Sequence, residues 1–104
     1  GARRPYYLGL LAEVLIGLGR RRDAAGTLAE AIDAARRTED RWWEPELLRL
    51  RATLAPAGRR RGELQSALEL ARAQGSAALE ARIQETLDVG EAAGERARNA
   101  SETL

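Results

Sequence analysis

The sequence lacks cysteine, histidine, lysine, phenylalanine and methionine. Without cysteine there is no disulfide framework and no thiol chemistry. Without histidine, cysteine and lysine, most nucleophile–base pairs and most transition-metal sites are unavailable. The phosphate-binding pattern GxxxxGK[ST] is also missing, as is a GxGxxG that follows a strand. Carboxylate pairs remain, but the acidic residues are spread over polar helix faces. We therefore expect no catalytic residues, no cofactor and no metal.

Long apolar runs and a strong charge imbalance are missing as well. No run approaches the roughly 20 residues of a membrane-spanning helix, and a net charge of +1 gives no strong attraction to nucleic acid or to a membrane surface. All 17 basic residues are arginine, which, with the many alanines, is typical of a GC-rich bacterial genome. The missing methionine and the leading Gly1 favour a fragment of a longer protein. We expect a cytoplasmic bacterial source and no membrane partner.

An approximate internal repeat is the most informative pattern that is present. Leu28, Ala31, Ile32, Ala35 and Arg36 recur thirty-six positions later as Leu64, Ala67, Leu68, Ala71 and Arg72. Each copy follows another apolar helical stretch across a break that contains glycine. Paired helices that repeat at this period are typical of a helical solenoid, in which each unit buries its apolar face only against its neighbours. The fold class we predict is all-α.

Apolar residues at helical spacing predict helices at residues 5–18, 22–37, 42–54, 60–74 and 77–89. Gly19 and Gly75 are predicted to end the first and the fourth helix, and Ser76 to cap the fifth. No strand signal is present. These helices form one predicted domain, residues 1–90. Residues 91–104 are predicted to be a weak sixth helix that frays, or a disordered tail.

Pro45 leaves two alternatives for the start of the third helix. Either Asp40 caps a helix that starts near Trp42, or the regular helix starts at Pro45 after an irregular approach. The two adjacent tryptophans point about 100° apart on a helix, so one stripe cannot bury both. We predict that Trp43 lies in the core. For Trp42 the alternatives are an exposed interface residue and a cover over the end of the first or second helix.

Each predicted helix has an inward stripe. The first stripe is Tyr7, Leu11, Val14 and Leu18, widened by Leu8 and Leu15; the second is Ala24, Leu28, Ala31, Ile32 and Ala35; the third is Trp43, Leu47, Leu50 and Leu54; the fourth is Leu64, Ala67, Leu68 and Ala71; and the fifth is Leu79, Ile83 and Leu87.

The first two helices resemble a tetratricopeptide repeat (TPR). The first-helix positions of that motif are held by Leu8, Leu11, Ala12 and Leu15, the turn by Gly19, and the second-helix positions by Ala24, Leu28 and Ala31. The second unit is a poorer match: Leu48 and Ala52 stand in for Leu8 and Ala12 at an offset of forty. The resemblance implies antiparallel hairpins, two and a partial third, stacked as a short right-handed solenoid of five to six helices.

The run AEVLIGLGRRRDAAGTLAEAIDAARRTEDRWWEPELLRLRATL, with SALELARAQGS after it, resembles one bacterial group. These are the TPR-like C-terminal regions of P-loop ATPase-linked nucleotide cyclases and LuxR-type transcriptional regulators. The resemblance implies a non-catalytic protein–protein interaction module of a larger regulator. The alternative is a structural or sensory spacer that homodimerises through exposed solenoid ends.

The first helix of each unit lines the concave face of a TPR-like stack, so a protein or peptide partner is expected there. The candidate partner-binding residues are Tyr6, Glu13, Ile16, Trp42, Glu46, Arg49 and Thr53. Changing Glu13 or Arg49 should then weaken partner binding without unfolding the domain. The alternative is that this groove is only the solvated side of a spacer. Two arginine runs, residues 20–22 and 59–61, lie at the turns, where nucleic-acid contact is the less favoured alternative to solvated turns.

Overall fold

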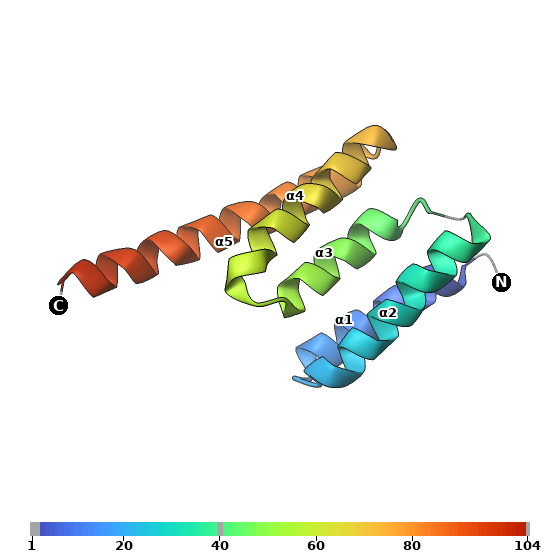
Figure 1. Ribbon diagram of the computed structural model, residues 1–104, viewed down its shortest axis with the longest axis horizontal. Coiled ribbons are helices and arrows are strands. Elements are labelled where there is room, and N and C mark those ends of the chain that lie inside the picture. Colours follow the sequence, from blue (N-terminus) through green and yellow to red (C-terminus); the bar gives the residue numbers. More distant parts are fainter. Residues whose placement is uncertain (1–2, 40, 104) are drawn as a thin grey trace.

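The computed structural model describes residues 3–39 and 41–103, and it is all-helical over those residues, as predicted. Figure 1 shows the arrangement of its helices. They are α1 (Arg4–Gly17), α2 (Arg21–Thr38), α3 (Glu44–Leu54), α4 (Ala57–Ala73) and α5 (Ala77–Thr103). Within the described ranges, no helix combines the length and the hydropathy that a membrane span requires.

Glycines end α1 and α4 as the sequence predicts. Gly19 and Gly75 have φ angles of +77° and +70°, the left-handed region that glycine enters without a steric penalty. After α1, the Gly19 N–H donates to the Ile16 carbonyl and the Arg20 N–H to the Leu15 carbonyl, at 3.0 and 2.9 Å. This pair of bonds is a Schellman motif, which satisfies the last carbonyls of the helix. The same pattern follows α4, so the turn from α1 to α2 and the turn from α4 to α5 are both specified locally.

The start of α3 agrees with the second of the two alternatives. Glu44 and Pro45 are its first two helical residues, and Trp43 is the N-cap. Proline fits the first turn because its missing N–H has no partner there in any case. A helix that starts near Trp42 is therefore wrong, and the tryptophans form an irregular approach. The N-cap predicted at Asp40 lies outside the described residues.

The C-terminal segment differs from its prediction. The helix that was expected to end near Val89 continues without a break to Thr103, so there is no separate sixth helix. Gly90 and Gly94 do not break it, because neither has a positive φ, and a glycine inside a helix costs only about 0.5–1 kcal/mol relative to alanine. The surrounding alanine, glutamate and arginine residues favour helix strongly enough to offset that cost.

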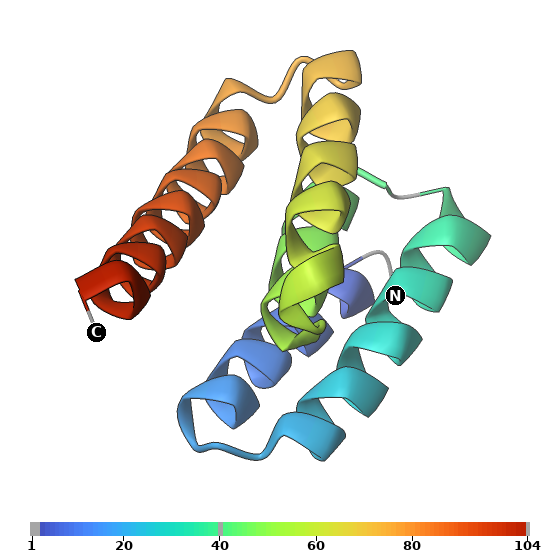
Figure 2. The same cartoon turned by 60° about the vertical axis from the view of Figure 1, so that its left-hand side comes forward.

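The helices pack mostly against their neighbours in the chain. The consecutive pairs from α1–α2 to α4–α5 are in contact, α1 also touches α3, and α3 also touches α5. Among the described residues, the backbones of α1 and α2 do not come close to those of α4 and α5, and α3 is the helix that contacts both groups. Figure 2 shows the two hairpins and α5 following one another, in a molecule of 54 × 31 × 18 Å. The right-handed, TPR-like stack stays a prediction.

The core confirms the stripes predicted for the second, fourth and fifth helices, all of whose members are buried. In α3, Leu47 and Leu50 are buried and Trp43 and Leu54 pack against the core as half-buried residues. Six of the sixteen residues in this core are alanines, which let the backbones approach closely where they lie between helices. The buried apolar residues that form this core are Ala12, Leu28, Ala31, Ile32, Ala35, Leu47, Leu48, Leu50, Ala52, Leu64, Ala67, Leu68, Ala71, Leu79, Ile83 and Leu87.

The stripe predicted for the first helix is wrong. Tyr7, Leu11, Val14 and Leu18 are 49–68% exposed. The buried residues of α1 are instead Pro5, Gly9 and Ala12, with Leu8 and Ile16 half-buried beside them. Periodicity could not select the face, because α1 is apolar nearly all round. The small residues Gly9 and Ala12 decided it, since α2 and α3 approach most closely over them.

Candidate partner-binding face

The seven candidate residues lie on adjoining elements, but they differ in what they can offer a partner. Tyr6, Glu13 and Ile16 belong to α1; Glu46, Arg49 and Thr53 belong to α3; and Trp42 lies just before α3. Trp42 and the Glu13 side chain are about half exposed, at 50% and 53%. Glu46 is only 1% exposed and Arg49 14%. The polar centre of the predicted groove is therefore enclosed by the chain itself.

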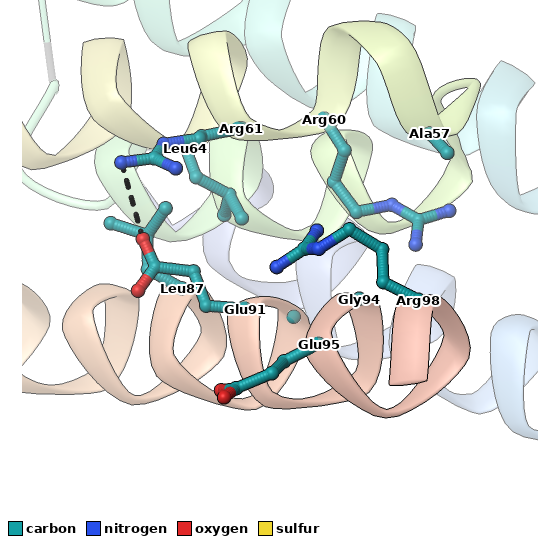
Figure 3. Close-up of a pocket in the computed structure, with 10 residues that line it drawn as sticks. Ala57, Arg60, Arg61, Leu64, Leu87, Glu91, Gly94, Glu95 and Arg98 are labelled. Atoms are coloured by element: carbon teal, nitrogen blue, oxygen red, sulfur yellow. Dashed lines mark ion pairs between the residues drawn. The ribbon is translucent and has the colours of Figure 1, made fainter. Parts of the chain in front are cut away.

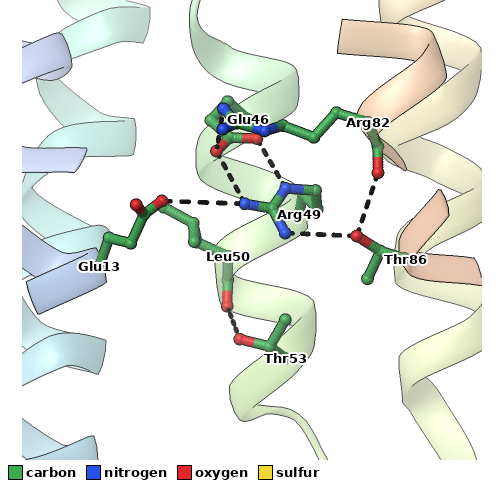
Figure 4. Close-up of polar contacts among 7 residues, drawn as sticks. All are labelled: Glu13, Glu46, Arg49, Leu50, Thr53, Arg82 and Thr86. Carbon is green, nitrogen blue, oxygen red and sulfur yellow. Dashed lines mark hydrogen bonds and ion pairs between the residues drawn. The ribbon is translucent and has the colours of Figure 1, made fainter. Parts of the chain in front are cut away.

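Glu46 is the centre of a polar cluster that joins α3 to α5. Its two carboxylate oxygens accept hydrogen bonds from Nε and Nη2 of Arg49, at 2.7 and 2.8 Å, in a bidentate pair. Nη1 of Arg82, on α5, donates to Oε2 of Glu46 at 3.1 Å. A buried carboxylate needs such partners, because desolvation would otherwise disfavour its charge. Figure 4 shows how the side chains converge from three helices.

Arg49 makes two further contacts that span the molecule. Its Nη1 donates to Oγ1 of Thr86 on α5 at 3.3 Å, and its Nη2 lies 3.9 Å from Oε2 of Glu13 on α1. The hydrogen bond from Arg49 to Glu46 raises the pKa of Arg49, with the nearby acidic charges adding to the effect against the opposing effect of burial. Arg49 thus remains charged and holds α1, α3 and α5 together. A variant of Arg49 should destabilise the fold, contrary to the expectation from sequence.

Arg82 and Thr86 were not among the candidate residues. Both residues belong to α5, which starts thirty-one residues after Glu46. No predicted helix face therefore contained either of them together with Glu46. The separation of Glu46 and Arg82, thirty-six residues, equals the repeat period. That coincidence is the one signal in the sequence that places the two side chains at equivalent positions of successive units.

An aromatic cluster lies where the start of α1 meets the start of α3. The Tyr6 ring stacks on the Trp42 ring, with centroids 6.0 Å apart and an interplanar angle of 24°. Tyr6 also lies 5.2 Å from Trp43 and 5.5 Å from Tyr7, centroid to centroid. Trp43 packs against the core, as predicted. Trp42 covers the beginning of α1 through Tyr6 and remains half exposed. Its role as an interface residue stays a prediction.

Gly9 makes room for Trp43. A Cβ at Gly9 would lie 2.9 Å from Cδ2 of Leu47 and 3.0 Å from Nε1 of Trp43, closer than real side chains pack. The indole Nε1 is buried and has no hydrogen-bond partner among the described residues. Beside it is a pocket of about 170 Å³ between α1, α3 and α5. It is lined by Tyr6, Gly9, Leu10, Glu13, Trp43, Glu46, Leu50 and Arg82.

Comparison with known proteins adds no relative. No family model, no curated protein and no solved structure matches this chain. The TPR-like resemblance and the parent regulator therefore stay predictions, and the argument for function depends on the geometry of the chain itself.

A second buried carboxylate, Glu44, was missed by the sequence reasoning. Glu44 is 1% exposed and begins α3. Nε of Arg36 and Nε of Arg41 donate to its two oxygens at 3.0 and 2.6 Å. Burial raises the pKa of Glu44, but the hydrogen bonds and charges of Arg41 and Arg36 outweigh it, so the pKa lies below its ordinary value. The pair Glu44–Arg36 ties α3 to the end of α2.

The arginine runs have a structural role at the end of α3. Nη2 of Arg21 donates to the Leu54 carbonyl at 3.2 Å. Arg60 donates to the carbonyls of Ala52 and Ala55 at 3.3 and 3.1 Å. Cations that bind the last carbonyls of a helix satisfy orphan acceptors and favour the negative end of its dipole. One arginine of each run thus binds carbonyls at the end of α3, and a second one forms an ion pair, Arg20 with Asp23 and Arg61 with Glu91. Nucleic-acid contact stays a prediction.

A pocket of about 550 Å³ opens between the first half of α4 and the second half of α5. Figure 3 shows Arg60 and Arg61 from α4 above Glu91, Glu95 and Arg98 from α5. Nη2 of Arg61 and Oε1 of Glu91 lie 3.3 Å apart across it. Charges of both signs line this pocket. Over the described residues no group of three acidic side chains is arranged to hold a metal ion.

Proposed function

We propose that this chain is a non-catalytic, TPR-like protein–protein interaction module of a larger bacterial signalling or transcriptional regulator. The observation that carries the proposal is the half-exposed Trp42, stacked on Tyr6, which lines the pocket between α1, α3 and α5. Tryptophan and tyrosine dominate the residues whose truncation costs most binding energy in protein interfaces. An aromatic pair held in place before binding also loses little conformational entropy when a partner docks.

The polar cluster supports the same proposal indirectly. Glu46, Arg49 and Arg82 hold α1, α3 and α5 in a fixed arrangement, so the groove edge does not need to order itself on binding. Glu13 is half exposed at this edge, and its carboxylate lies 3.9 Å from the guanidinium group of Arg49, a long ion pair. A protein or peptide that anchors an apolar side chain on Trp42 and extends along α1 would reach Glu13 two helical turns after Tyr6. We therefore retain Tyr6, Glu13 and Trp42 as binding residues, and give Glu46 and Arg49 a supporting role.

The proposal is tested by photo-crosslinking in the source cell. A photoreactive phenylalanine analogue at position 42 should capture a protein that the same analogue at position 89 does not, since Val89 is comparably exposed but lies on α5. The captured protein is then purified and its affinity measured. Trp42→Ala should weaken binding at least tenfold while the circular dichroism spectrum stays unchanged, and Val89→Ala should bind as the original chain does. Equal affinity of all three proteins would refute the assignment of Trp42.

A further inference from the structure

The outer face of α1 is an uncovered apolar surface. We call the five side chains that form it the α1 stripe, and they follow one another at helical spacing. Their exposed fractions are 59% for Tyr7, 42% for Leu10, 49% for Leu11, 58% for Val14 and 68% for Leu18. Together they expose on the order of 500 Å², which is at the size where a patch on a monomer is usually functional.

The composition of α1 shows that this surface is not an ordinary solvated face. Arg4 and Glu13 are the only charged residues in the helix. Arg4 forms an ion pair with Glu30 of α2, and Glu13 lies on the side of α1 that faces Arg49. A helix that is apolar all round is normally covered on all sides. In this structure α2 and α3 cover only one side of α1, so a partner for the opposite side is missing.

The second hairpin shows what kind of surface the α1 stripe is. At the offset of forty that relates Leu8 to Leu48, Tyr7 and Leu10 correspond to Leu47 and Leu50 of α3. Leu47 and Leu50 are buried, and Leu47 lies against Gly9 of the preceding hairpin. The equivalent positions in α3 thus pack against helices. At these two positions α1 carries apolar side chains that no helix covers, whereas Leu11 corresponds to the exposed Arg51, so the pattern of α1 is more apolar than that of α3.

We propose that the α1 stripe is the interface of a homodimer, in which α1 packs against α1 of a second copy about a two-fold axis. The area supports a second copy: two stripes bury about 1,000 Å² in total, the lower limit for a specific interface. The rest of the described surface offers no apolar counterpart, because the other exposed large apolar residues, Trp42 and Val89, are isolated from each other on separate elements. Because the described surface offers no different apolar partner for the stripe, we expect the stripe of one copy to pack against the stripe of another. Both stripes are then covered, so the assembly stops at two chains.

We place the two-fold axis across the middle of the stripe, near Leu11, so that the two α1 helices run antiparallel and the apolar side chains of one copy face those of the other. The stripe between the two ends contains no charge that would have to be desolvated. This proposal is independent of the face at Trp42.

Sedimentation equilibrium of the purified chain tests the proposal, with two matched variants. Val14→Glu places a carboxylate in the stripe, and Val89→Glu places one at a similarly exposed valine of α5. We expect a dimer with a micromolar dissociation constant for the original chain and for Val89→Glu. Val14→Glu should weaken dimerisation at least a hundredfold, because the interface would bury an unpaired charge. Both variants should retain the helical circular dichroism spectrum, since both side chains lie outside the core.

Crosslinking gives a second readout, which the absence of cysteine makes clean. Leu11→Cys should form an intermolecular disulfide under mild oxidation, and Val89→Cys should not. A chain that stays monomeric at all concentrations would overturn the proposal and leave the stripe to a different protein or to another segment of the same polypeptide. Equal effects of Val14→Glu and Val89→Glu would overturn it as well. Trp42→Ala should leave the dimer intact, so failure here is distinguishable from failure of the proposed partner face.

Discussion

Replacing Arg49 by methionine would test whether the buried cluster around Glu46 holds the helices together. Methionine has a similar length and no charge, so the change removes hydrogen bonds while it leaves most of the packing in place. Glu46 would lose two of its three donors and keep only Arg82. Because Glu46 is 1% exposed, water cannot replace the lost bonds.

The expected cost follows from the burial of the carboxylate. Removing one partner of a buried ion pair destabilises a protein by about 3–5 kcal/mol. The remaining bond from Arg82 places this case at the lower end, about 3 kcal/mol. For a domain of this size that loss corresponds to a decrease in melting temperature of roughly 12–24 °C. Arg82→Met removes only one bond from a side chain that is 49% exposed, so it should cost about 1 kcal/mol or less.

A double variant separates charge isolation from packing. Glu46→Leu combined with Arg49→Met replaces the whole pair by apolar groups, and such replacements are often neutral. We expect its stability to lie within about 1 kcal/mol of the original chain. Urea denaturation at pH 7, followed by circular dichroism, measures all three. The reasoning is refuted if Arg49→Met costs no more than Arg82→Met, or if the double variant is as unstable as Arg49→Met alone.

Four further substitutions test particular positions by thermal and urea denaturation. Gly9→Ala should destabilise the fold by about 1–3 kcal/mol, because the new methyl group overlaps Leu47 and Trp43. Gly17→Ala has nothing within 4 Å of its Cβ, so it should stabilise the fold by about 0.5–1 kcal/mol. Similar effects of the two substitutions would contradict the close approach of Leu47 and Trp43 to Gly9. Gly90→Ala should also stabilise by about that amount, and a loss would show that α5 ends there. The lowered pKa of Glu44 stabilises the fold above the ordinary value of 4.5, and this contribution is lost as the pH falls through the lower, folded pKa. Glu44→Gln should flatten that acid-side decrease in a pH series, and an unchanged slope would count against the ion pairs of Glu44.

The sequence correctly predicted the features that depend on nearby residues. Small and large apolar residues alternate at helical spacing in α2 and α4, and that pattern has only one apolar side to bury. The stops at Gly19 and Gly75 are equally local, because a left-handed residue is needed at the end of each helix and glycine adopts it freely. Continuous helix through Gly90 was missed, since the same residue type can end a helix or lie within one.

The all-α class, the helical hairpins and most of the core were thus determined by the sequence alone, because each follows from residues within a few turns of one another. Only the tertiary structure decided which side of α1 is covered, because an all-round apolar helix has no preferred face until Trp43 and α3 approach over Gly9. It also decided that Glu46 meets Arg82, since a contact between side chains thirty-six residues apart exists only when α3 and α5 lie together. The buried carboxylates and the open α1 stripe are properties of that packing, and no local pattern contains them.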